Sequence, residues 1–166
     1  IKTNHTFITA KNVNEHINAG VDLVIDCGDS QMAKAAVIAR ARRLRIPVIT
    51  IGAAGGRVDP SRVKIRDLAK TYGDPLLASV RQTLRNRYGF SRTEGKRFSV
   101  SAVFSDEQVR YFQEDGFIGT EKPREGNANF NCVSALGAVT HLTASFAFHA
   151  SARAIDLLLN LKPRVS

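Results

Sequence analysis

The feature that most constrains the fold is the stretch of residues 21–36, which reads VDLVIDCGDSQMAKAA. Its first six residues predict a parallel strand buried on both faces, because the run of Val, Leu and Ile is almost continuous. We expect a helix directly afterwards, with Ser30 as its N-cap. A strand, a short turn and a helix in this order are typical of an open α/β sheet, whose ligands bind at the carboxyl ends of the strands.

Two carboxylates and a lysine follow the end of this strand. Asp26 and Asp29 lie three residues apart, and Lys34 lies one turn inside the expected helix. An acidic strand end that faces a helix N-terminus and a lysine can hold a metal-bound phosphate. The alternative is that the two acids only cap the helix and shape the turn, and the spacing alone favours this alternative.

The composition limits the compartment and the partners. The chain has 166 residues, enough for one domain with its own core, and a formal net charge of +9. This charge favours an anionic partner such as nucleic acid, a nucleotide or a membrane surface, although a solvated basic surface has the same composition. Cys27 and Cys132 are the only cysteines, so no zinc-ribbon pattern is present and we expect a reducing, cytoplasmic setting. Because the chain starts at Ile1 and its only methionine is Met32, we expect an incomplete single domain over residues 1–166, whose upstream part is missing.

The remaining segments continue the α/β pattern. The alternation and the capping residues predict the following elements: strands at 1–8, 46–52 and 97–105, helices at 12–19, 31–44 and 74–89, and a long surface loop within 90–131. The strand–helix–strand over 21–52 forms a βαβ unit with a right-handed crossover. After it, residues 52–57 (GAAGGR) allow close approach of the backbone to a ligand or to another chain segment.

Residues 62–66 (RVKIR) alternate with a period of two, which places Arg62, Lys64 and Arg66 on one side of a strand. This basic stripe can belong to a solvated edge strand or can face a polyanion. Two further arginines, Arg81 and Arg85, lie on exposed parts of the expected helix 74–89.

The last expected element is one long helix over residues 132–161. Residues 132–152 contain no charged side chain, which is the pattern of a membrane span, but the many Ser, Thr and His residues favour a buried packing helix. Contact with a membrane is therefore not expected.

The motifs together resemble a known group of enzymes. VIDCGDS, then Lys34 and IPVITIGAAGGRVDP, resemble the ubiquitin-activating-enzyme-like adenylating superfamily. DLAKTYGDPLLASVRQTLR, SVSAVFS and NCVSALGAVTHLTASFAF are similar to the tRNA threonylcarbamoyladenosine dehydratase family within it. The resemblance covers essentially the whole chain but only the C-terminal part of that family. It implies the C-terminal part of a Rossmann-like adenylating fold, with a mostly parallel sheet flanked by helices and a long buried C-terminal helix.

The resemblance implies an activity and roles for individual residues. The family cyclises a modified adenosine beside the tRNA anticodon, using ATP and Mg²⁺. Asp29 matches the aspartate that contacts Mg²⁺ and ATP, Lys34 matches the basic residue after it, and Asp26 is the first acid of the nucleotide-binding motif, expected to brace the turn. Cys132, placed by the helix prediction at a helix N-terminus, is a candidate for a catalytic or sulfur-accepting role, with a buried structural cysteine as the alternative.

The implied partners are tRNA, a second copy of the chain and a sulfur-transfer or cysteine-desulfurase-type protein. Arg62, Lys64 and Arg66 are the first candidates for tRNA binding, and Arg81 and Arg85 are the second. The family's glycine-rich phosphate loop would lie upstream of Ile1, so this chain alone is expected to be inactive. The alternatives are an adenylating enzyme for another carboxylate, or a non-catalytic module that binds tRNA or protein.

Overall fold

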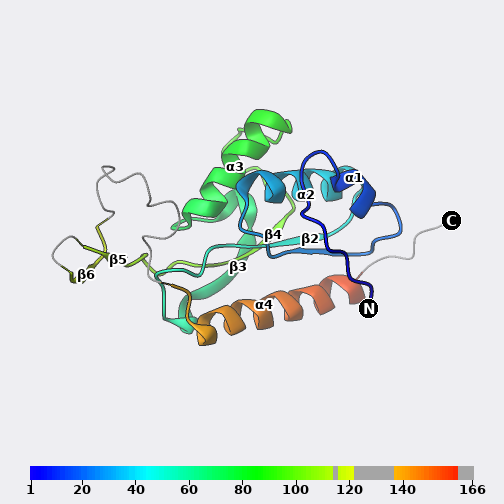
Figure 1. Cartoon of the computed structure of the whole chain (residues 1–166). Helices are drawn as coiled ribbons and strands as arrows, with labels where there is room; N and C mark the ends of the chain where they lie inside the picture. Colours follow the sequence, from blue (N-terminus) through cyan, green and yellow to red (C-terminus); the bar gives the residue numbers. More distant parts are fainter. Residues whose placement is uncertain (114–115, 122–136, 161–166) are drawn as a thin grey trace.

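The computed structural model describes residues 1–113, 116–121 and 137–160, and Figure 1 shows their arrangement. The elements follow in this order: α1 (Val13–His16), β1 (Val24–Asp26), α2 (Gln31–Arg43), β2 (Val48–Ile51), η1 (Pro60–Arg62), β3 (Val63–Asp67), η2 (Leu68–Lys70), α3 (Pro75–Arg87), β4 (Ser101–Ser105), β5 (Tyr111–Phe112), β6 (Ile118–Gly119) and α4 (Thr140–Leu159).

Four strands form the central sheet in the order β1-β2-β4-β3. β1 pairs in parallel with β2, and β2 pairs in parallel with β4, whereas β3 runs antiparallel to β4 at the edge. The predicted α/β class with a mostly parallel sheet is therefore confirmed. Residues 63–66 fall on an edge strand as expected, whereas Arg62 is the last residue of η1 and directly precedes that strand. β5 and β6 form a separate antiparallel pair away from this sheet (Figure 1).

Helices cover both faces of the sheet. α1, α2 and α3 lie on one face and α4 lies on the other (Figure 1). Because successive side chains of a strand point to opposite faces, Ala102 and Phe104 of β4 join the core under α2 and α3, while Val103 packs against α4. The inner strands β2 and β4 are thus buried on both sides, which is why residues 48–51 and 102–104 are mostly apolar.

The two long helices on the first face begin at the caps that the sequence predicts. The Ser30 hydroxyl accepts a hydrogen bond from the backbone N–H of Ala33 at the start of α2. The Asp74 carboxylate accepts one from Leu77 at the start of α3, which has Pro75 as its first residue. Each cap satisfies a backbone donor that has no partner within the helix.

The structure differs from the predictions at both ends of the chain. Residues 1–8 form no strand; most of their side chains are exposed and none of the described strands pairs with them. The last helix begins at Thr140 and not at residue 132, since Val139 before it is extended. Cys132 lies outside the described residues, and the argument that it sits at the N-terminus of this helix is wrong, because residues 137–139 already precede α4 without helical structure.

The last helix packs on the sheet through one stripe. Its buried residues are Leu142, Phe146, Ala150 and Ala154, each four positions after the one before. The opposite face carries exposed apolar side chains, among them Phe148 and Leu159, which are 74% and 80% exposed. In the described part of the chain, no helix combines the length and the apolar character that crossing a membrane requires.

Candidate active site at the carboxyl edge of the sheet

The carboxyl ends of β1, β2 and β4 meet at one edge of the sheet, because these three strands are parallel. Each strand is followed there by a polar segment: the turn after Asp26, the loop at 52–57, and residues 105–107. In open α/β sheets this edge is the usual place for a ligand. The candidate site is therefore built from these three segments.

The turn after β1 is held by a buried ion pair. Lys34 Nζ lies 3.0 Å from Asp26 Oδ2, and the two side chains are 0% and 6% exposed. Asp26 also accepts hydrogen bonds from the Thr50 hydroxyl at 2.7 Å and the Gly28 backbone N–H at 3.2 Å. Lys34 donates to the Gly28 carbonyl at 2.9 Å. Asp26 thus braces the turn as expected, and Lys34 is engaged by the same turn.

Beyond this turn, Cys27 and Asp29 are exposed. Asp29 immediately precedes Ser30, the N-cap of α2, so its carboxylate is carried at the N-terminal end of that helix. The exposure of Cys27 follows from the path of the chain, which leaves the sheet after Asp26. Partial desolvation raises the pKa of the Cys27 thiol, the negative charge of Asp26 raises it further, and Lys34 opposes the shift. Cys27 is therefore a protonated thiol at neutral pH and a poor nucleophile.

The glycine-rich loop approaches another chain segment closely. A Cβ on Gly52 would collide with the Asp74 carboxylate, and Ala53 donates its backbone N–H to the same carboxylate at 2.9 Å. Gly56 has a φ of +72°, and a Cβ there would lie 2.6 Å from the carbonyl oxygen of Arg110. The glycines let this loop pack against the start of α3 and the segment that follows β4.

Arg57 at the end of this loop is completely buried. Its guanidinium donates to three backbone carbonyls: Glu107 at 2.9 Å, Ala53 at 2.5 Å and Gly73 at 2.6 Å. Burial lowers the pKa of Arg57, and the carboxylates of Asp74 and Glu107 oppose this shift. An arginine remains charged in such a setting. Arg57 therefore ties together the segments that follow β2 and β4 and the one that precedes α3.

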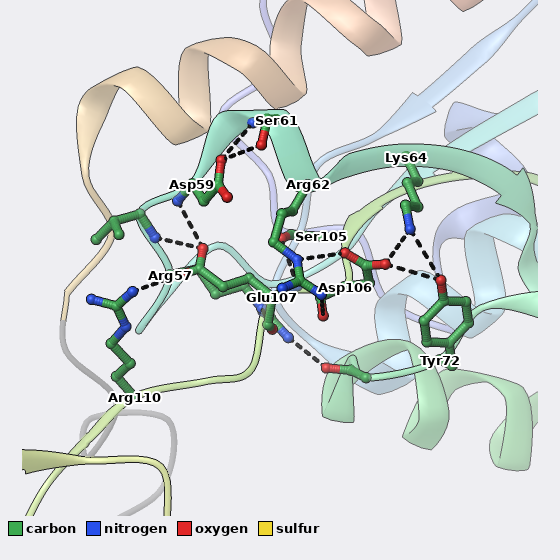
Figure 2. A network of polar contacts seen from close by, with 12 residues as sticks. Arg57, Asp59, Ser61, Arg62, Lys64, Tyr72, Ser105, Asp106, Glu107 and Arg110 are labelled. Atoms are coloured by element: carbon green, nitrogen blue, oxygen red, sulfur yellow. Dashed lines mark hydrogen bonds and ion pairs between the residues drawn. The ribbon is translucent and has the colours of Figure 1, made fainter.

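Glu107 completes this arrangement from the other side. Its Oε2 accepts hydrogen bonds from the backbone N–H groups of Val58 and Asp59, both at 2.8 Å, and its Oε1 lies 3.1 Å from Arg110. Figure 2 shows how Glu107 lies between the loop and Arg110. Sequence reasoning missed both Arg57 and Glu107, because fully buried charged residues are rare and neither belongs to a recognisable spacing.

The adjacent Asp106 brings two residues of the basic stripe together. Its carboxylate accepts from Arg62 Nε at 2.9 Å, from Lys64 Nζ, and from the Tyr72 hydroxyl at 3.0 Å (Figure 2). These bonds, with Lys64 first and then Arg62, hold the pKa of Asp106 well below its usual range. Arg66 instead lies over the Tyr72 ring, 5.6 Å from its centre, and forms no ion pair within the described residues. The stripe is thus divided: two cations are neutralised and one is not.

We expect Asp106→Asn to lower the free energy of unfolding at neutral pH and to make that free energy less dependent on pH in acid. A carboxyl whose pKa is lowered in the folded state stabilises the fold above its unfolded pKa of about 3.9, and this stabilisation is lost as the pH falls through the folded pKa. Urea unfolding at pH 7 measures the loss of stability, and repeating it at intervals down to about pH 2, well below the unfolded pKa, measures the change in pH dependence. The exposed Glu94→Gln serves as the control, and an unchanged pH profile for Asp106→Asn would contradict the prediction.

The two arginines of α3 have different surroundings. Arg81 donates to the Thr71 hydroxyl and lines a cavity of about 510 Å³ beside Asp74, Asp106 and Thr120. Burial lowers the pKa of Arg81, and the positive charge of Arg85 adds to this. Arg85 donates to the Ser91 carbonyl at 3.3 Å and packs over the Phe98 ring. Only Arg81 therefore faces the carboxyl edge.

Comparisons with known proteins agree on one family, although no protein-family model matches the chain. The tRNA threonylcarbamoyladenosine dehydratase of Haemophilus influenzae is 44% identical over 156 residues, covering 94% of this chain and 58% of that protein. The dehydratase of Escherichia coli is 40% identical over 154 residues, covering 92% of this chain and 58% of that protein.

A solved structure gives the same result in three dimensions. The crystal structure of the E. coli tRNA N6-threonylcarbamoyladenosine dehydratase in complex with ATP matches with a TM-score of 0.73 and 35% identity, over 93% of this chain and 54% of that chain. The chain thus spans somewhat more than half the length of the relatives it matches. Over that part of their length, the chain is similar in sequence and in structure to the tRNA threonylcarbamoyladenosine dehydratases.

Proposed function

We propose that the protein is an ATP-dependent tRNA-modifying enzyme of the cytoplasm, which cyclises threonylcarbamoyladenosine beside the anticodon with net loss of water. The observation that carries this proposal is the 44% identity to a named dehydratase over 94% of the chain. The exposed Asp29 at the carboxyl edge of the parallel sheet supports it, since this is where the fold binds ligands.

The proposed chemistry begins with a carboxylate, which is a poor electrophile. The threonyl carboxylate would take the adenylyl group of ATP with release of pyrophosphate, and ring closure would then break the acyl–phosphate bond and release AMP, which carries away the carboxylate oxygen. This transfer requires neutralisation of negative charge on the phosphates. In support, relatives from E. coli have been solved in complex with ATP and with AMP.

Asp29 is the residue of this chain that fits Mg²⁺. Mg²⁺ is usually bound through one or two carboxylates together with substrate phosphates, and it does not need a complete set of protein ligands. Among the described residues no group of three or more His, Cys, Asp and Glu side chains is placed to hold a metal. A single exposed carboxylate beside the N-terminus of α2 agrees with a metal shared with a nucleotide.

Lys34 and Asp26 would act mainly by fixing this carboxylate in position. Lys34 Nζ is buried and is bound by the Asp26 carboxylate and the Gly28 carbonyl. In this arrangement the turn lies between the ammonium group and any phosphate at the edge of the sheet. We propose that the ion pair holds the turn and thereby orients Asp29. A direct phosphate contact by Lys34, as the resemblance implies, stays a prediction.

Other parts of the proposal concern the assembly. The family's glycine-rich phosphate loop is expected outside the part matched by this chain, so the 166 residues alone should be inactive. A homodimer is supported by the exposed apolar face of α4, where Phe148, Ile155 and Leu159 are 74%, 59% and 80% exposed. A sulfur-transfer partner depends on Cys132, which lies outside the described residues, and it stays a prediction.

The experiment that tests the function is Asp29→Asn in the complete protein. With ATP, Mg²⁺ and tRNA, we expect formation of the cyclic nucleoside to slow about tenfold or more, because a carboxylate that neutralises charge in the transition state has been removed. Nucleoside mass spectrometry measures the loss of water, and tRNA affinity should be unchanged. Glu94→Gln is the matched control, and equal rates for both variants would remove Asp29 from the mechanism.

A further inference from the structure

Two adjoining grooves lie at the end of the sheet opposite the candidate active site. The first, of about 540 Å³, lies between the end of β3, the start of β4 and α4, and contains Arg66, Arg97 and Arg153. The second, also of about 540 Å³, lies where α2 and α3 end. Arg97 lines both grooves, and so joins them. The cationic residues of the two grooves form what we call the basic band: Arg42, Arg43, Arg66, Lys96, Arg97 and Arg153.

The charge of this band is only partly compensated. Among the described residues, Asp67 is the one acidic residue that lines either groove, and its carboxylate accepts hydrogen bonds from the backbone N–H groups of Ala69, Phe98 and Ser99. Arg97 Nε lies 3.7 Å from it, with a side chain that is 71% exposed. Arg153 pairs with Asp156 and donates to the Ser101 hydroxyl.

The other four cations have no carboxylate partner within the described residues. Arg42 and Arg43 occupy the last turn of α2, where the helix dipole favours positive charge, so their position also has a structural reason. This reason does not apply to Arg66 or Lys96, which lie on an edge strand and in a loop. Surplus positive charge in a concave surface attracts anions.

The band differs in this respect from the basic stripe on β3. Arg62 and Lys64 are neutralised by Asp106, whereas Arg66, the third residue of the stripe, belongs to the band. An arginine without a carboxylate partner can form two parallel hydrogen bonds to a phosphate. The capacity for phosphate binding therefore lies mainly at the end of β3 that is remote from Asp106.

The extent of the band indicates a polymer as its ligand. One groove lies against α4 and the other against α2 and α3, on opposite faces of the sheet, so a single small anion cannot engage both. The five residues of β3, about 17 Å long, separate the band from the carboxyl edge. We propose that the basic band binds the phosphodiester backbone of tRNA, at a distance from the base that is modified. This inference rests on the proposed function, which supplies the tRNA.

The test is the double substitution Arg66→Gln with Arg97→Gln in the complete protein, with tRNA affinity measured by fluorescence anisotropy at several salt concentrations. Both side chains are exposed, so the fold should tolerate the change. We expect the Kd to rise about tenfold, and the slope of log K against log salt to decrease by about 1.4–1.8, which corresponds to two lost phosphate contacts. The control, Lys11→Gln with Arg87→Gln, removes two exposed cations that line neither groove.

A second measurement locates the contact on the RNA. The affinities of an anticodon stem-loop and of the same loop with a shortened stem are measured for the unaltered protein and for the double variant. If the band holds the stem, shortening it weakens binding to the unaltered protein and changes the affinity of the double variant little, since the two changes remove the same contacts.

Each other outcome overturns the inference. Equal losses for the double variant and the control would show an effect of net charge alone, and no loss would show that tRNA binds elsewhere. Binding to anionic vesicles in place of tRNA would assign the band to a membrane. Turnover with ATP and tRNA is measured separately on the unaltered protein. If that protein turns over but the double variant binds tRNA as tightly as it does, the band is rejected and the proposed function is kept. If the double variant loses tRNA affinity but the unaltered protein shows no turnover, the proposed function is rejected and the band is kept.

Discussion

Replacing Lys34 with methionine is expected to lower the free energy of unfolding by about 3–5 kcal/mol. The substitution leaves the Asp26 carboxylate buried without a positive charge, although Thr50 and Gly28 still donate to it. Removing one member of a buried ion pair costs much more than removing an exposed one, because the remaining charge is separated from water. Urea unfolding, with the slope checked for constancy, measures the loss.

Two further variants establish whether the loss comes from the buried charge. Asp26→Asn combined with Lys34→Met should be more stable than Lys34→Met alone, because the amide keeps a hydrogen-bonding group for Thr50 without a buried charge. The exposed Lys70→Met should change stability by less than about 0.5 kcal/mol. A loss below about 1 kcal/mol for Lys34→Met would contradict a buried pair as the support of this turn.

Arg57→Met is expected to cost at least about 3 kcal/mol. The variant removes the donors of three backbone carbonyls, those of Ala53, Gly73 and Glu107, and each buried acceptor left without a partner costs about 1–3 kcal/mol. Hydrogen exchange should also show faster exchange in the segments that Arg57 joins, which follow β2 and β4 and precede α3.

Arg110→Met is the matched control for this variant. Arg110 contacts the same residue, Glu107, but its side chain is 45% exposed and it makes one ion pair at 3.1 Å. Exposed pairs contribute about 0–1 kcal/mol, so the control should lose little. If both variants lose the same small amount, the buried guanidinium does not hold these loops together.

Much of the fold could be predicted because the informative patterns are local. The strand, the turn and the cap at Ser30 each occupy a few adjacent residues, and the βαβ unit follows from their order. Residues 1–8, which were expected to form a strand, show where this reasoning fails. A strand-like pattern forms a strand only if a neighbouring strand pairs with it, and the local sequence does not reveal that neighbour. The start of α4 was misplaced because residues with small side chains before Thr140 have no strong signal for a helix boundary.

The candidate site was less predictable because its contacts join distant residues. Asp26 at the end of β1 and Lys34 in the first turn of α2 are only eight positions apart, and their proximity follows from the motif. Asp106 lies 44 residues from Arg62 in the sequence, so the neutralisation of the stripe depends on the pairing of β3 with β4. The same holds for Arg57 and Glu107, 50 residues apart.

The strand order has a consequence for the path by which the chain folds. β4 comes after β3 in the sequence but lies between β2 and β3 in the sheet, so β3 has no sheet partner until β4 has been placed. Asp67, at the end of β3, receives N–H groups from Phe98 and Ser99 just before β4, and so joins the two ends of the excursion that contains α3. The entropy cost of closing such a loop comes before its contacts can stabilise the chain, and this slows folding. The pairing of edge strand β3 with β4 is thus a long-range step of assembly, because the paired residues, from Val63 with Ser105 to Asp67 with Ser101, lie 42 to 34 positions apart in the sequence.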